Sequence, residues 1–66
     1  MVITEKTIAG SWYTISCTAA CSVTEVVGDG VSHLVTLDDA GQEHFRAAGA
    51  EVTIETDGSY VLYPFD

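Results

Sequence analysis

Residues 50–66 read AEVTIETDGSYVLYPFD, and this segment gives the clearest indication of the fold class of the chain. Residues 50–56 and 59–65 are rich in Val, Thr, Ile and Tyr, and apolar side chains recur at alternate positions, which is typical of β-strands. Asp57-Gly58 between them favours a two-residue type I′ turn. The sequence therefore predicts a β-hairpin over residues 50–65.

The register of this hairpin predicts two different faces, because residues opposite one another in an antiparallel pair share a face. The apolar face pairs Thr56 with Ser59, Ile54 with Val61, Val52 with Tyr63 and Ala50 with Phe65. The other face is amphipathic and pairs Glu55 with Tyr60, Thr53 with Leu62 and Glu51 with Pro64. One small core cannot cover both faces, so the role of the second face becomes the main functional question.

The rest of the chain has the same β-rich composition between turn-like glycines. Strands are predicted near 2–8, 11–17, 21–27, 31–37, 50–56 and 59–65. We expect a mostly β fold in a single domain over residues 1–66. Its architecture is expected to be a small antiparallel β-sandwich or barrel of about six short strands with at most one helical turn.

A second hairpin is predicted around the loop Gly28-Asp29-Gly30. A three-residue loop gathers the valines on one face better than a two-residue loop does. It also places Glu25 opposite His33 in an apolar row, which favours a half-buried histidine that is neutral or ion-paired with its neighbour. The apolar pairs expected in this register are Val27 with Val31, Val23 with Val35 and Cys21 with Leu37.

The segment DDAGQEHFRAAG, residues 38–49, offers the signals of a short helix. Asp39 can act as an N-cap, Gln42 as its capping-box partner and Gly49 as the terminating residue. Gly41 weakens this helix, and an irregular loop anchored by Phe45 is the alternative.

Composition and charge exclude several classes of function. The chain has 66 residues, 47% of them hydrophobic, which is too apolar for a disordered tail. Its formal net charge of −8 repels phosphate backbones and anionic lipid, so no direct binding to nucleic acid or to membranes is expected. No apolar run has the length of a membrane span, and the N-terminal residues lack the pattern of a signal peptide.

The two cysteines and two histidines supply the ligand types of a structural zinc site. Cys17 and Cys21 are four residues apart, so their sulfurs meet only if CTAAC forms a tight turn, because this spacing in a strand separates them by roughly 13 Å. Two buried free thiols are the favoured interpretation, with a disulfide or zinc bound with His33 and His44 as the alternatives. No metal and no cofactor are predicted, and a reduced cytoplasmic origin is expected.

No catalytic residues are predicted. Asp38 and Asp39 are adjacent carboxylates, but Asp is favoured in turns for its bonds to backbone amides, and we interpret the pair as the start of the helix. No nucleophile elbow, phosphate loop or dinucleotide fingerprint occurs in the sequence. A core this small also leaves little volume for a substrate pocket, so no enzymatic activity is expected.

The predicted interaction surface consists of Trp12, Tyr60 and Leu62. These side chains lie on the strand faces opposite to the predicted core, and large aromatic residues outside a core are enriched at protein interfaces. The alternative is a second small core covered by the N-terminal strand around Ile3 and Ile8. The aromatic residues assigned to the main core are Tyr13, Tyr63 and Phe65.

The order of these features resembles short virion proteins of tailed bacteriophages. The segments are AGSWYTIS (9–16), CSVTEVVGDGVSHLVTL (21–37) and AAGAEVTIETDGSYVLYPFD (47–66), and the similarity spans residues 9–65. The resemblance implies a small β-sandwich or barrel that forms a homo-oligomer or attaches to capsid or tail proteins, as decoration or fibre, without catalysis. Cys17, Cys21 and DDAGQEHF (38–45), where such proteins often have a Pro-containing loop, depart from this pattern.

We therefore expect a non-catalytic structural module that binds proteins, self-associates through β-surfaces and is part of a virion made in the host cytoplasm. The alternative is a small acidic inhibitor, cytoplasmic in location, whose ten carboxylates imitate DNA phosphates and bind a basic protein. Salt separates the two hypotheses, because binding by charge mimicry weakens as salt rises whereas apolar β-contacts persist.

Overall fold

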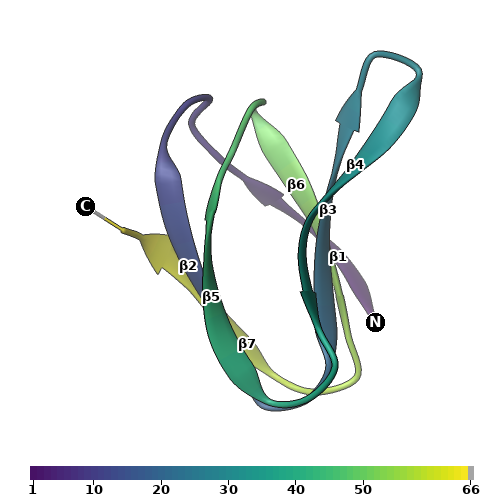
Figure 1. The fold of residues 1–66 in the computed structure, drawn as a ribbon, viewed down its shortest axis with the longest axis vertical. Coiled ribbons are helices and arrows are strands. Elements are labelled where there is room, and N and C mark those ends of the chain that lie inside the picture. The colour runs from purple at the N-terminus through teal and green to yellow at the C-terminus, as the bar shows by residue number, and fades with distance from the viewer. Residues whose placement is uncertain (66) are drawn as a thin grey trace.

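Two antiparallel sheets form a β-sandwich in the computed structural model, which describes residues 1–65 (Figure 1). Asp66 of the predicted domain lies outside the described residues. The larger sheet has the strand order β1-β6-β3-β4 and the smaller sheet the order β5-β2-β7. The strands are β1 (Val2–Lys6), β2 (Trp12–Cys17), β3 (Cys21–Val27), β4 (Gly30–Leu37), β5 (Gly41–Arg46), β6 (Glu51–Thr56) and β7 (Tyr60–Pro64). The predicted mostly β architecture is confirmed.

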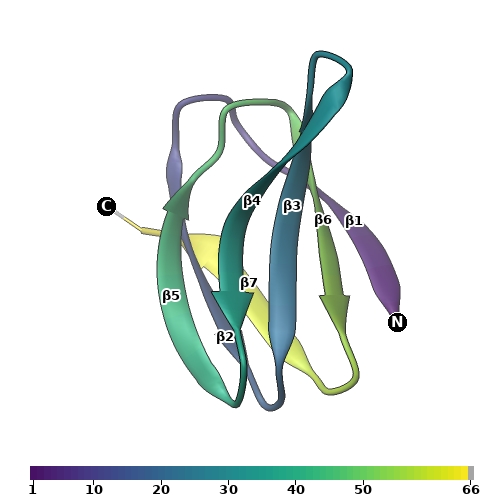
Figure 2. The same cartoon turned by 45° about the vertical axis from the view of Figure 1, so that its right-hand side comes forward.

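The chain passes repeatedly from one sheet to the other. Only β3 and β4 are joined within one sheet among the described strands, whereas every other connection crosses between the layers (Figure 2). Crossing connections bring strands that are distant in sequence next to each other, as in the pairs of β1 with β6 and of β2 with β7. The result is a thin molecule with extents of 29 × 28 × 15 Å.

The core lies between the two sheets and is made by alternate residues of each strand. Ile15 of β2 and Ile54 of β6 are fully buried at its centre, one from each sheet. Tyr13 and Phe45 stack beside them, with ring centroids 5.8 Å apart. The buried apolar residues are Tyr13, Ile15, Cys17, Cys21, Val23, Val35, Phe45, Ala47, Val52 and Ile54.

The predicted C-terminal hairpin is wrong, because β6 and β7 belong to different sheets. A type I′ turn requires two consecutive residues with positive φ, and in residues 1–65 only Gly10 and Gly28 have positive φ. The Asp57-Gly58 segment therefore leads the chain from one sheet to the other. In a flat hairpin Ile54 and Leu62 would lie on opposite faces, whereas opposed sheets let both face one core.

The predicted middle hairpin is correct at its base and wrong at its tip. Cys21 pairs with Leu37 and Val23 with Val35, as expected. A β-bulge after Val23 then shifts the register by one residue, so that Glu25 lies opposite Ser32 instead of His33. His33 is exposed, and the expected half-buried histidine beside Glu25 is wrong. The shift shortens the loop to Gly28-Asp29, with Val26 opposite Val31.

The predicted helix is also wrong, because the same residues form β5. Asp39 Oδ1 accepts a hydrogen bond from the adjacent Ala40 N, at 2.8 Å, and not from the amides that an N-cap would satisfy. Pairing with β2 satisfies the backbone instead, with Phe45 opposite Tyr13. The alternative of an irregular loop is wrong for the same reason, although Phe45 is buried in the core, as that alternative expected.

Cys17 and Cys21 form a disulfide, and the favoured prediction of two free thiols is wrong. The strand ends of β2 and β3 bring the two Cα atoms to 6.6 Å, because CTAAC forms the tight turn between the two sheets. Both residues are buried, as expected. Within residues 1–65 no cluster of three or more His, Cys, Asp or Glu side chains is arranged to hold a metal ion.

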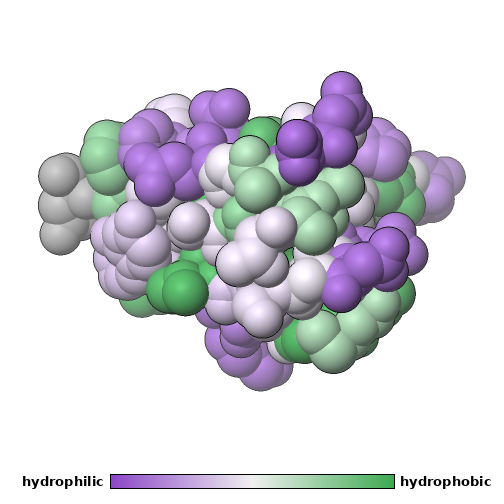
Figure 3. Space-filling model, turned by 90° about the horizontal axis from the view of Figure 1, so that it is seen from below, coloured by the Kyte–Doolittle hydropathy of each residue, from purple (hydrophilic) through white to green (hydrophobic). Residues whose placement is uncertain are grey.

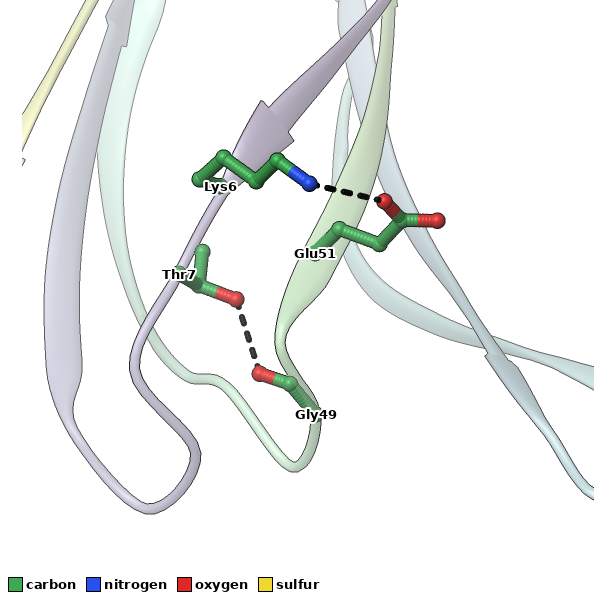
Figure 4. Close-up of polar contacts among 4 residues, drawn as sticks. All are labelled: Lys6, Thr7, Gly49 and Glu51. Carbon is green, nitrogen blue, oxygen red and sulfur yellow. Dashed lines mark hydrogen bonds and ion pairs between the residues drawn. The ribbon is translucent and has the colours of Figure 1, made fainter.

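The N-terminal edge strand β1 is attached to β6 by the ladder and by side-chain contacts (Figure 4). Lys6 Nζ lies 3.9 Å from Glu51 Oε2 in an exposed ion pair. Just beyond the strand, Thr7 Oγ1 donates a hydrogen bond of 2.8 Å to the carbonyl oxygen of Gly49. These contacts hold β1 at the edge of the larger sheet, next to β6. Across residues 1–65 the fold offers no helix able to cross a membrane.

The two ends of the sandwich differ in shape. The lower end in Figure 1 consists of the connections β2–β3, β4–β5 and β6–β7, and its surface mixes hydrophilic with hydrophobic patches (Figure 3). At the upper end the β3–β4 hairpin extends beyond the other strands (Figures 1 and 2). β3 pairs with β6 only over Cys21–Thr24, so the outer part of this hairpin has no third strand.

Candidate interaction surface

The outer face of the smaller sheet presents a group of aromatic side chains. Strand alternation points Tyr13, Ile15 and Cys17 of β2 inward, so Trp12, Thr14 and Ser16 point outward. The ladder aligns Thr14 with His44 of β5 on one side and with Tyr63 of β7 on the other. Residues on all three strands therefore share this outer face.

Its large side chains are well exposed. Trp12 is 48% exposed, and Tyr63 and Phe65 are each 43% exposed. Phe65 follows β7, and its amide donates a hydrogen bond of 3.0 Å to the carbonyl oxygen of Trp12, which holds the two residues side by side. We call the group of Trp12, His44, Val61, Tyr63 and Phe65 the aromatic face.

Contacts with two neighbouring residues hold His44 in place. Its ring stacks on that of Phe65, with centroids 3.9 Å apart and an angle of 12° between the planes. A hydrogen bond of 2.7 Å joins His44 Nδ1 to Thr14 Oγ1. Thr14 is buried although it points outward, because the surrounding side chains cover it. The stack is thus a preorganised surface that loses little side-chain freedom on binding.

A hollow of about 430 Å³ opens at one end of the aromatic face, lined by Gly10, Ser11, Trp12 and Phe65. We call it the Trp12 hollow. Its volume falls within the range of small-molecule sites, and it is lined mainly by apolar atoms. Gly10 has φ +85°, a conformation that other residues rarely adopt, and its backbone turns the chain into β2 at this point.

Arg46 supplies positive charge at the margin of the Trp12 hollow. It lies opposite Trp12 in the ladder, and its Nε donates a hydrogen bond of 3.0 Å to the carbonyl oxygen of Gly10. Gly10 and Arg46 also line an adjacent hollow of about 280 Å³, together with Ala47 and Ala48. In the described part of the chain, the guanidinium of Arg46 forms no ion pair with a carboxylate.

Of the three predicted surface residues, only Trp12 lies on the aromatic face. Leu62 lies opposite Ile15, and Tyr60 lies opposite Cys17, so both point inward. Both are partly buried against the core. The prediction that all three share one outer face is therefore wrong. Tyr63 and Phe65, expected in the core, point outward instead.

The predicted alternative, a second small core under the N-terminal strand, is wrong, because Tyr60 and Leu62 pack against the main core. The N-terminal strand does contact Tyr60, through a polar side chain. The Tyr60 hydroxyl donates a hydrogen bond of 2.6 Å to Glu5 Oε2 of β1. This bond, with burial and the nearby negative charge, raises the pKa of Tyr60 to about 12. Ile3 is half-buried, whereas Ile8 is largely exposed. The N-terminal strand thus covers this region with Glu5 rather than with Ile8.

Sequence reasoning missed His44, Val61, Tyr63 and Phe65 as members of the surface. His44 was expected in the short helix. Val61, Tyr63 and Phe65 were expected in the core, because β6 was the expected partner of β7. One feature of the sequence could have indicated the correct partner of residues 60–64. In WYTISC, Trp12 and Ile15 fall on opposite faces of a strand, so this strand has one apolar side chain for the core and one for the outer face. Pairing residues 60–64 with this strand, with Leu62 beside Ile15, places Tyr63 outward next to Thr14.

Glu25 is another residue whose surroundings were predicted wrongly from the sequence. Its carboxylate is buried and accepts hydrogen bonds from the amides of Ala48, at 3.2 and 3.1 Å, and of Gly49, at 2.6 Å. Because buried carboxylates are stable only with such partners, Glu25 ties β3 to the β5–β6 connection. Its role here is to support the end of the sandwich that carries the Trp12 hollow.

The aromatic face offers ring stacking and apolar contact, and Arg46 adds one guanidinium beside it, on strands held by backbone pairing. These are the features of a surface that binds a partner by shape and apolar burial. Comparison of the chain with protein-family models, with curated proteins and with solved structures finds no match.

Proposed function

We propose that this protein is a non-catalytic structural module that binds proteins through the aromatic face and self-associates, as a small component of a phage virion. The observation that carries the proposal is the exposure of Trp12, Tyr63 and Phe65 side by side on one sheet face. A chain of 66 residues has few large apolar side chains to build its core. Placing three aromatic ones outside it favours a surface that is covered by a partner.

Charge supports apolar contact as the basis of self-association. The formal net charge of −8 makes copies of this chain repel one another at long range. Association then depends on local burial of aromatic and aliphatic side chains, whose contribution is roughly 25 cal/mol per Å². Added salt screens the repulsion without weakening apolar contacts, so the assembly is expected to resist salt.

The resemblance to small virion proteins of tailed phages supports the location in a particle. The disulfide between Cys17 and Cys21 agrees with this proposal, because disulfides persist in oxidising surroundings, such as the outside of a cell or virion surfaces. Capsid or tail proteins are the proposed further partners. They would contribute the surface to which an oligomer of this chain attaches.

The test is the mass in solution, measured by light scattering coupled to size exclusion at two concentrations and at low and high salt. Val61→Thr on the aromatic face and Val2→Thr on the larger sheet form a matched pair, since the two valines are 60% and 63% exposed. Threonine keeps the β-branched shape and removes apolar surface. We expect a salt-resistant oligomer that Val61→Thr weakens and Val2→Thr does not.

A monomer of 7.0 kDa under every condition would contradict self-association. Equal effects of the two substitutions would show that the aromatic face is not the contact surface. Capture of a basic DNA-handling protein by a monomer, lost as salt rises, would support the acidic-inhibitor alternative instead.

A further inference from the structure

The tip of the β3–β4 hairpin exposes three apolar side chains. Val26 and Val31 lie opposite each other and are 74% and 62% exposed, and Val27 is also exposed. These three residues and the Gly28-Asp29 turn between them are called the valine tip. β-branched residues are favoured in strands, but Thr would satisfy this preference without exposing apolar surface. The preference for strand therefore does not explain why the tip carries Val.

The position of the valine tip suits it for contact with another molecule. The hairpin extends beyond the other strands at the upper end of the sandwich (Figures 1 and 2). Pairing of β3 with β6 ends at Thr24, so the tip is a two-stranded ribbon. An isolated ribbon of this kind is marginally stable in water, and burial of its valines against a partner would stabilise it.

The Trp12 hollow has the complementary properties. It is concave and apolar, and Arg46 at its margin carries one of the two basic side chains of the chain. The valine tip is convex and apolar and carries the exposed carboxylate of Asp29 at its turn. Contact would therefore pair apolar with apolar surface and Asp29 with Arg46, in a chain whose net charge otherwise opposes self-association.

We propose that the valine tip of one copy docks into the Trp12 hollow of the next copy. This inference rests on the proposed self-association and names the two surfaces that meet. Such a contact is heterologous, because two different surfaces of the same chain join, and it produces a ring if the rotation closes or a filament if it does not. The tip and the β1–β2 connection, which contains Gly10 and Ser11, both lie at the upper end of the sandwich (Figure 1). Copies therefore associate side by side.

The first test reduces the apolar contact. Replacement of both Val26 and Val31 by Thr keeps the strand-forming shape and removes apolar surface from the contact. We expect the dissociation constant of the assembly to rise about thirtyfold, which corresponds to about 2 kcal/mol. Val2→Thr is the matched control, and circular dichroism verifies that every variant is folded.

The second test exchanges the charges. Asp29→Arg and Arg46→Glu each place like charges at the contact, and each variant alone is expected to remain monomeric at concentrations where the wild type assembles. In an equimolar mixture every contact again joins opposite charges. The arginine introduced at the tip of the first variant meets the glutamate introduced at the hollow of the second, and the unchanged Asp29 and Arg46 meet at the next contact. The mixture is therefore expected to assemble, with copies of the two variants alternating.

Failure of the mixture to exceed the mass of either variant alone would overturn the tip–hollow contact. If the wild type assembles and Val61→Thr weakens it while the tip variants do not, the proposed function stands and this inference is wrong. A wild type that is monomeric at all concentrations would overturn both. Assembly of either charge variant alone would show that Asp29 and Arg46 do not meet.

Discussion

Two neighbouring residues of β7 provide a direct test of which side chains face the core. Leu62 points inward opposite Ile15 and is partly buried, whereas Val61 points outward opposite Ser16. Substitution of each by Lys places the same charged side chain on opposite sides of one strand. We expect Leu62→Lys to destabilise the fold and Val61→Lys to leave its stability nearly unchanged.

The magnitude follows from burial. Full burial of a leucine side chain contributes about 1.5–3 kcal/mol, and the cavity left beside Ile15 adds to the loss. β7 is an edge strand, so the lysine stem can reach solvent and its ammonium avoids full burial. We therefore expect Leu62→Lys to lower the free energy of unfolding by about 2–3 kcal/mol. Val61→Lys should stay within about 0.5 kcal/mol.

Urea unfolding followed by the fluorescence of Trp12, the one tryptophan, measures both variants. With a slope of about 1 kcal/mol per molar urea for a small domain, the midpoint should fall by about 2–3 M for Leu62→Lys. The protein is kept at one low concentration, because the proposed self-association would also raise the apparent stability. Equal midpoints for the two variants, or a larger loss for Val61→Lys, would refute the assignment of faces and with it the aromatic face.

Three further predictions concern contacts that hold the sandwich together. Glu25→Gln replaces a charged acceptor by an amide and should lower the free energy of unfolding by about 1.5–3 kcal/mol, measured by urea titration, whereas Glu55→Gln on the exposed side should change little. Reduction of the disulfide, which closes a loop between cysteines four residues apart, should cost about 2 kcal/mol. Alkylation of the unfolded, unreduced protein would contradict the disulfide. Tyr60 should ionise near pH 12 in an absorbance titration, and Glu5→Gln should lower its pKa. Because the unfolded state releases this proton near pH 10, stability is intact below pH 10 and should decline as pH rises to about 12.

Local patterns were sufficient to predict most of the strands. The alternation in WYTISC, in CSVTEVV and in EVTIET needs only neighbouring residues, and all three segments are strands within two residues of the predicted limits. The segment GQEHFR was different. Its glycine and polar residues give no strand signal, and it is a strand because β2 has an edge that it pairs with and because Phe45 fills the core.

The faces of β7 could not be predicted from local patterns. YVLYP is apolar at nearly every position, so alternation does not distinguish its two sides. Choosing β6 as its partner puts Tyr63 and Phe65 inside, and pairing with β2 puts them outside. Every candidate residue on β7 changes sides with this one choice, because the side-chain period of a strand is two.

The amino-acid sequence was sufficient to establish the β-rich composition, the acidic charge, the positions of most strands and the base of the β3–β4 hairpin. These properties depend on residues close together in the chain and on their hydration. The folded structure was needed to show that β6 and β7 lie in opposite sheets, that Cys17 bonds Cys21 and that Trp12 and Phe65 lie side by side. Those outcomes depend on which distant strands pair, and that choice is made by burying Ile15, Ile54 and their neighbours in one shared core.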